Sequence, residues 1–81
     1  MLKGVMFVKI KVKLFATFRE GRFAVETMEF PEGSTVLDVA NKLQIEPDDV
    51  SIAMINGSSS ELHDVLKDGD TLVLFPPVGG G

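Results

Sequence analysis

The chain has 81 residues, enough for one domain with one hydrophobic core, and its 44% apolar and 25% charged content is typical of a globular domain. It contains no cysteine, which excludes a disulfide framework, a thiolate metal site and a cysteine nucleophile. The formal net charge of −4 disfavours nucleic acid and anionic membranes as partners, and it favours a partner whose docking surface is basic. Because no apolar stretch approaches the roughly 20 residues of a membrane span, we expect a cytoplasmic protein.

The first two predicted elements form a hairpin. Residues 8–15 alternate between apolar and lysine side chains, which predicts a half-buried strand. A polar cluster at 17–22 predicts a turn, and residues 23–30 form a second strand with Met28 and Phe30 toward the core. The basic row of the first strand is interpreted as a solvated face or as protection against edge pairing. This row consists of Lys9, Lys11 and Lys13.

A helix is predicted after residues 31–34, where proline removes a ladder donor and glycine opens a turn. Thr35 can cap this helix, and Asp38 places an acid in its first turn, where the helix dipole favours negative charge. Apolar residues recur at helical spacing and give the helix one stripe that faces the sheet. The stripe consists of Val36, Val39, Ala40 and Leu43.

Three shorter segments complete the chain. Residues 51–55 predict a brief strand, followed by the turn signal Asn56-Gly57. Residues 58–66 are polar and irregular, which indicates a long loop or a short edge strand. Its expected buried anchors are Leu62, Val65 and Leu66. After a turn at 67–70, residues 71–75 form the last strand, with Leu72 and Leu74 on one face and Val73 and Phe75 on the other.

This order of elements predicts an α+β fold in which one main helix packs across a mixed sheet of four to five strands. Residues 1–81 form a single domain, and 76–81 form a flexible C-terminal tail. Because the tail has no polar side chain, its functional group is the carboxylate of Gly81. Pro76-Pro77 ends sheet pairing and directs the tail outward, and residues 79–81, which lack a Cβ, suit a narrow channel better than a merely frayed end. A carboxylate reacts with a sulfur or amine nucleophile only after activation, for example as an acyl-adenylate, so another protein must activate it.

The C-terminal sequence reads Phe75-Pro76-Pro77-Val78-Gly79-Gly80-Gly81. It resembles the Phe-Pro-Pro-Val-x-Gly-Gly ending of the molybdopterin synthase small subunit. Further matches to that family follow in the same order along the chain, at residues 12–16, 19–20, 31–36 and 66–70. The whole series resembles the MoaD/ThiS sulfur-carrier family, whose fold is the ubiquitin-like β-grasp.

This resemblance implies that an E1-like enzyme adenylates Gly81 with ATP and magnesium, and that a sulfurtransferase then converts the adenylate to a thiocarboxylate. In the molybdopterin branch the tail inserts into the large subunit of molybdopterin synthase, which holds the catalytic side chains. The chain itself would be a carrier that binds no cofactor. By position, Gly81 carries the sulfur, Gly80 is the slender neighbour required for tail insertion, and Gly79 occupies a variable position.

Partner contacts are expected around the tail. Phe75 is predicted to be an exposed aromatic anchor, with a partly covered strand residue as the alternative. Arg19 and Arg22 could pair with acids of a partner, although arginine in a polar turn is more often solvated. His63 and the scattered aspartates indicate neither a metal site nor an acid–base pair. The expected partner-binding residues are Phe75, Pro76, Pro77, Val78, Gly79 and Arg19.

Two departures leave the pathway open. The connection at 20–22 is shorter than in many molybdopterin carriers, and the crossover at 43–51 is compact, as in thiamin-type carriers. The alternatives are therefore a thiamin-type sulfur carrier and a ubiquitin-like modifier conjugated to lysines through Gly81. A third class, a passive interaction domain, would form neither a thiocarboxylate nor a lysine conjugate at Gly81.

Overall fold

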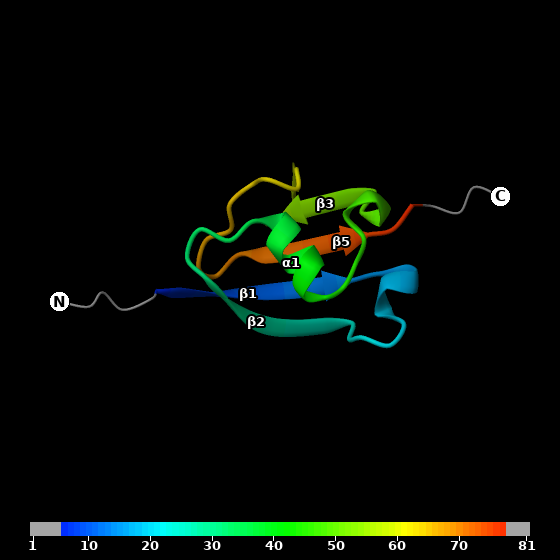
Figure 1. Cartoon of the computed structure of the whole chain (residues 1–81), viewed down its shortest axis with the longest axis horizontal. Helices are drawn as coiled ribbons and strands as arrows, with labels where there is room; N and C mark the ends of the chain where they lie inside the picture. The colour runs from blue at the N-terminus through cyan, green and yellow to red at the C-terminus, as the bar shows by residue number, and fades with distance from the viewer. Residues whose placement is uncertain (1–5, 78–81) are drawn as a thin grey trace.

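Strands β1 (Phe7–Leu14) and β5 (Thr71–Phe75) lie side by side and parallel near the middle of a five-stranded sheet (Figure 1). The computed structural model describes residues 6–77. The strand order is β2-β1-β5-β3-β4, and the other three pairings are antiparallel. The remaining strands are β2 (Val25–Pro31), β3 (Ile52–Ile55) and β4 (Ser58–Ser60). The predicted mixed sheet, hairpin and short edge strand are confirmed.

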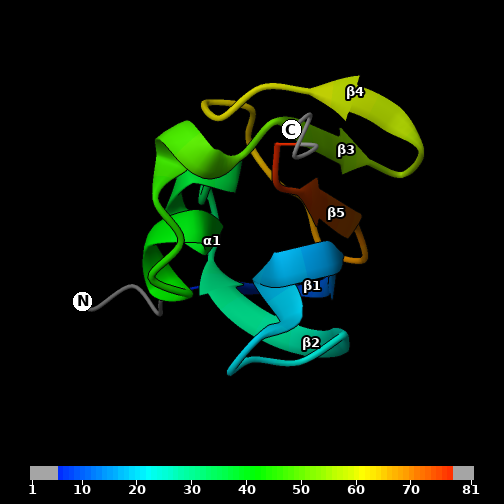
Figure 2. The ribbon, with the colours of Figure 1, turned by 90° about the vertical axis from the view of Figure 1, so that its right-hand side faces the viewer.

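Helix α1 (Val36–Lys42) covers one face of this sheet and leaves the other face open (Figure 2). Its stripe of Val36, Val39 and Ala40 is fully buried, and Leu43 packs against the core from its C-cap. The alternating residues of the strands supply the other half of the core. Those that are completely buried are Ile10, Val12, Leu14, Leu72 and Leu74. The two predicted layers are therefore present, and Lys9, Lys11 and Lys13 lie on the open face.

The start of α1 is held by its own side chains and by a distant loop. Thr35 and Asp38 form a complete capping box even though aspartate replaces the usual glutamate or glutamine. The loop after β4 adds two backbone bonds, because the N–H groups of Val36 and Leu37 donate to carbonyls of this loop. Leu66 is buried as predicted, but Val65 is 55% exposed. The prediction for Val65 was wrong because its backbone bridges to Thr35 at the surface.

Two short 3₁₀ helices occupy the connections, η1 (Ala16–Arg19) after β1 and η2 (Pro47–Asp49) before β3. Pro31 belongs to β2 rather than ending it beforehand, which an edge strand tolerates because one side of its backbone is unpaired. Arg22 is not simply solvated, since its guanidinium donates to three backbone carbonyls. It joins the β1–β2 connection to the end of α1.

Candidate functional site

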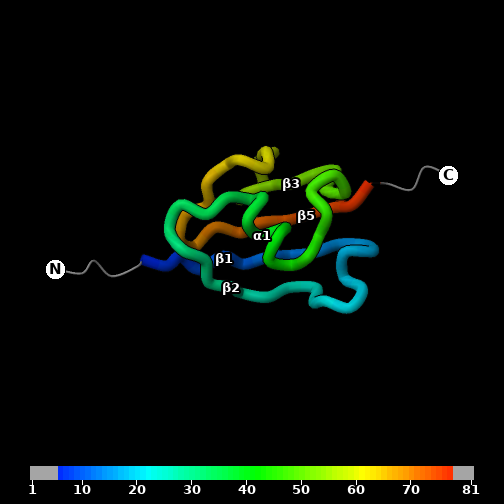
Figure 3. Tube along the Cα trace, viewed as in Figure 1, coloured from blue at the N-terminus to red at the C-terminus, as the bar shows by residue number. Residues whose placement is uncertain are grey.

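The C-terminal tail leaves the sheet at the edge where β1 also ends. Because β1 and β5 are parallel neighbours, their C-terminal ends lie at the same end of the sheet (Figure 3). Phe15 and Phe75 therefore both lie at this end of the sheet. The carbonyl of Phe75 accepts a 2.9 Å hydrogen bond from the Ser51 N–H, which fixes the last strand residue against the segment before β3. Pro76 and Pro77 then end the ladder, as expected from proline's missing donor. The sites predicted at Val78, Gly79, Gly80 and Gly81 lie outside the described residues.

An aromatic and cationic stack stands at the root of the tail. The rings of Phe15 and Phe75 are stacked, with centroids 4.7 Å apart and planes inclined by 14°. The guanidinium carbon of Arg19 lies 5.0 Å from the centroid of the Phe15 ring, within the range of a cation–π contact. Arg19 is oriented by its Nε, which donates to the Leu14 carbonyl at 2.7 Å. We call Arg19, Phe15 and Phe75 the tail-root stack.

Phe75 is half-buried in this stack, so its side chain is exposed only in part, as in the alternative of a partly covered strand residue. The predicted role of Phe75 as a docking anchor stays a prediction. Arg19 and Phe75 are brought together through Phe15, which sequence reasoning did not select. Phe15 continues the outward-facing series of the first strand, and this parity was the signal that could have identified it.

An apolar patch extends from the stack across the open face of the sheet. The register pairs Phe75 with Ile52 and Val73 with Met54, which places these four side chains on the same face. Ile52 is 46% exposed and the other three are half-buried. We call Ile52, Met54, Val73 and Phe75 the apolar patch. An exposed apolar area beside a chain terminus is suited to protein docking.

The remaining polar groups and the surface hollow lie apart from the tail-root stack. No group of three histidine, aspartate or glutamate side chains in residues 6–77 could hold a metal ion, and His63 contacts Glu61 in an exposed pair with a separation of 3.4 Å.

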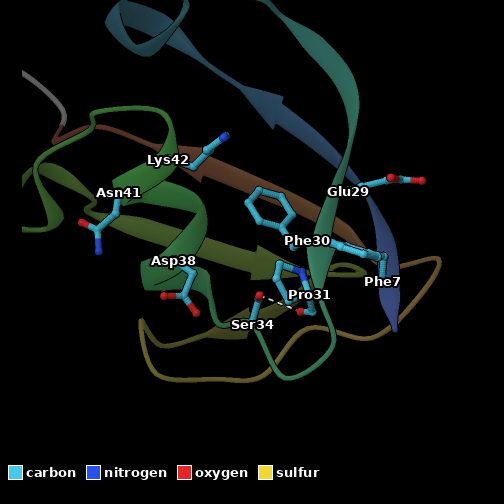
Figure 4. Close-up of a pocket in the computed structure, with 8 residues that line it drawn as sticks. All are labelled: Phe7, Glu29, Phe30, Pro31, Ser34, Asp38, Asn41 and Lys42. Carbon is cyan, nitrogen blue, oxygen red and sulfur yellow. Dashed lines mark hydrogen bonds between the residues drawn. The ribbon is translucent and has the colours of Figure 1, made fainter. Parts of the chain in front are cut away.

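An open groove of about 690 Å³ lies between α1 and β2, where Ser34 donates to the Pro31 carbonyl (Figure 4). Its lining residues are Phe7, Glu29, Phe30, Pro31, Ser34, Asp38, Asn41 and Lys42. No helix in the described part is long and apolar enough to cross a membrane.

A mixed sheet crossed by one helix, with the chain leaving from a central strand, defines a ubiquitin-like β-grasp protein. The ubiquitin of Caldiarchaeum subterraneum has the same fold, with a TM-score of 0.65, 22% identity, and coverage of 94% of this chain and 100% of that one. The chain belongs to the ThiS family, whose model matches residues 12–81. This is a family of small ubiquitin-like sulfur carriers. The resemblance recognised in the sequence is thereby confirmed.

Two solved structures are similar to this chain in sequence as well as in fold. The "Putative molybdopterin converting factor, subunit 1" of Pyrococcus furiosus is 35% identical, with a TM-score of 0.71 and coverage of 88% of this chain and 99% of that one. Small archaeal modifier protein 1 of Haloferax volcanii is 26% identical, with the same TM-score and the same coverages. A search of curated proteins gave no match.

Proposed function

We propose that this chain carries sulfur as a thiocarboxylate on Gly81 and donates it in the biosynthesis of molybdopterin, the ligand of molybdenum and tungsten cofactors. The observation that carries the proposal is the sequence of residues 75–81, which begins at the tail-root stack and matches the ending of the molybdopterin synthase small subunit. The 35% identity with the Pyrococcus furiosus protein supports the same pathway. In this proposal the chain is a non-catalytic small subunit that binds no cofactor.

The proposed activation of Gly81 has two steps, and both take place on partner proteins. In the first, the Gly81 carboxylate attacks the α-phosphorus of magnesium-bound ATP on an E1-like enzyme, forming an acyl-adenylate and releasing pyrophosphate. In the second, sulfide-level sulfur delivered by a sulfurtransferase attacks the acyl carbon and expels AMP. The thiocarboxylate then enters the large subunit of molybdopterin synthase, whose side chains catalyse the transfer to the pyranopterin precursor.

The described residues supply the docking surface for these steps. The apolar patch and the tail-root stack lie where the tail leaves the sheet, so a partner that receives the tail also meets Phe75, Pro76, Pro77 and Arg19. Aromatic and arginine side chains contribute disproportionately to binding energy when a partner covers them. In this proposal Val78 and Gly79 extend the same contact, and Gly80 and Gly81 reach the reacting atoms.

The test is reconstitution with the purified adenylating enzyme, the sulfurtransferase, a source of sulfide-level sulfur, ATP and magnesium. Exchange of one oxygen for sulfur at Gly81 raises the mass by about 16 daltons. Adding the large synthase subunit and the pyranopterin precursor should restore the original mass and yield molybdopterin. A variant lacking Gly80 and Gly81 is the matched control and should show neither change. Absence of the mass increase in the intact chain would contradict the proposal.

A protein modifier is the second candidate, because the chain is also similar to small archaeal modifier protein 1. The same adenylate would then react with a lysine amine of another protein. The product would be a larger conjugate, rather than a chain in which one oxygen is replaced by sulfur. A thiamin-type carrier is the third, since the matching family model is ThiS. It would form the thiocarboxylate but support thiazole rather than molybdopterin synthesis.

A further inference from the structure

Three lysines form a row on an interior strand of the sheet. Lys9, Lys11 and Lys13 project from the open face of β1, and β1 lies between β2 and β5. Lysines that protect a sheet against edge pairing belong on an edge strand. Of the two interpretations of this row, edge protection is therefore wrong, and the solvated open face remains.

No carboxylate of residues 6–77 lies within ion-pair distance of the lysine row. The one ion pair found within residues 6–77 is that of His63 and Glu61. Alternate residues of a strand are about 7 Å apart, so the three ammonium groups also repel one another. This repulsion is relieved where an acidic surface approaches the open face.

The positive charge is least opposed at the end of the row near the tail. Lys9 lies across from Glu29, and its backbone N–H donates to Asp68. Lys11 lies beside Thr71, near the Asp70 carbonyl to which its N–H donates. The next residues, by contrast, are apolar: Val25 and Val73 flank Lys13 on the two neighbouring strands.

The lysine row is continuous with the apolar patch. One cross-strand line on the open face runs from Lys13 through Val73 to Met54. A partner that covers Val73 and Met54 therefore also approaches Lys13. Lys11 is the neighbouring side chain on the same face of β1, two residues before Lys13. Since the patch is apolar, its occupant is a protein surface rather than a polyanion such as nucleic acid, whose charge the whole chain also repels.

From this arrangement we infer that the partner seated on the apolar patch presents acidic side chains to Lys11 and Lys13. The inference rests on the proposed function, which makes the adenylating enzyme such a partner. Overall net charge pointed to a basic partner surface, but part of the acidic charge lies away from this face, for example Asp38 on α1 and Asp48 and Asp49 in η2. The lysine row thus orients an otherwise acidic molecule with its tail toward the partner.

The experiment measures kcat and KM of the adenylating enzyme for the full chain by ATP–pyrophosphate exchange. Lys11→Gln/Lys13→Gln is compared with Lys42→Gln/Lys67→Gln, which removes the same charge from outside the open face. We expect the first pair of changes to raise KM about tenfold at low salt, to leave kcat within about twofold and to flatten the salt dependence. The second pair should behave like the unchanged chain. Lys11→Arg/Lys13→Arg, which keeps the charge, should restore KM.

Three other results would overturn the inference, and they differ in what they say about the proposed function. Equal KM values for the two glutamine variants would overturn the inference while leaving the proposed function intact. Absence of exchange with the unchanged chain would overturn the proposed function and this inference with it. Binding of the unchanged chain to a DNA duplex or to phosphatidylserine vesicles at about 0.15 M salt, abolished by Lys11→Gln/Lys13→Gln, would assign the row to a polyanion and overturn the inference.

Discussion

Arg22 illustrates how one side chain can connect two distant parts of a small fold. Its Nε and two terminal nitrogens donate to the carbonyls of Leu43, Phe18 and Gln44, at 2.9, 3.1 and 3.3 Å. The last carbonyls of a helix lack partners within the helix, and a cation there also complements the helix dipole. Arg22 therefore serves as a cap supplied from the β1–β2 connection.

We predict that Arg22→Met lowers the free energy of unfolding by about 1–2 kcal/mol, because it removes three hydrogen bonds and keeps the apolar stem. Urea denaturation measures the change. Lys67→Met, which alters an exposed cation in a turn, is the matched control and should change stability by less than about 0.5 kcal/mol. Equal stability of the two variants would show that the Arg22 contacts contribute nothing.

Phe75 allows a prediction about docking at the same scale. Phe75→Ala removes one ring of the tail-root stack and part of the apolar patch, so binding to the adenylating enzyme should weaken about tenfold or more. Titration of the enzyme with the folded variant measures the change. Val65→Ala removes an exposed apolar side chain beside the start of α1 and should leave binding unchanged. The docking role fails if Phe75→Ala binds as tightly as the unchanged chain.

Single residues were predictable where the pattern of their own strand decided their position. Leu72 and Leu74 are buried and Val73 is half-buried, as alternation in a strand requires. Arg22 was not predictable, because its partners at the end of α1 come close only once the chain is folded. The prediction that Val65 is buried was wrong for a similar reason. Its backbone bridge to Thr35 forms only in the folded chain and orients this part of the loop.

At the scale of elements, α1 has only seven residues, which is too short to be stable without caps. Its first turn is satisfied by the Thr35–Asp38 capping box and by the carbonyls of Leu62 and Asp64. We predict that Thr35→Ala lowers the free energy of unfolding by about 1 kcal/mol, measured by urea denaturation. Thr35→Ser keeps the hydroxyl acceptor and should recover most of the loss. If serine and alanine destabilise equally, the capping bond is not the cause.

Elements followed from the sequence more readily than their pairing did. Asn56-Gly57 forms the expected turn between β3 and β4, with φ angles of 52° and 85° that this residue pair tolerates. The side chain of Asn56 also bonds Asp70 and the Thr71 N–H, which no local pattern predicts. Likewise the parallel pairing of Lys11 with Thr71 joins opposite ends of the chain, and no local pattern predicts it.

At the scale of the whole molecule, the hydrophobic core and the proposed reactive group lie in different parts of the chain. Among residues 6–77, every core residue lies between Val8 and Leu74. Gly80 and Gly81 have no side chain to add to a core. The proposed chemistry, by contrast, takes place only at the carboxylate of Gly81. The folded body would then serve to present the tail and to orient it through the lysine row and the apolar patch.

A chain shortened by Gly80 and Gly81 separates these two roles. We predict that its free energy of unfolding in urea stays within about 0.5 kcal/mol of the full chain, because the core is intact. Formation of the thiocarboxylate, followed by mass spectrometry, should be lost completely, since the shortened chain ends at a residue that cannot reach the reacting atoms. Leu72→Ala is the opposite control: it empties a fully buried position and should cost about 2–5 kcal/mol, while any folded fraction still accepts sulfur. Sulfur transfer through the shortened chain at an undiminished rate would place the reactive group elsewhere in the protein.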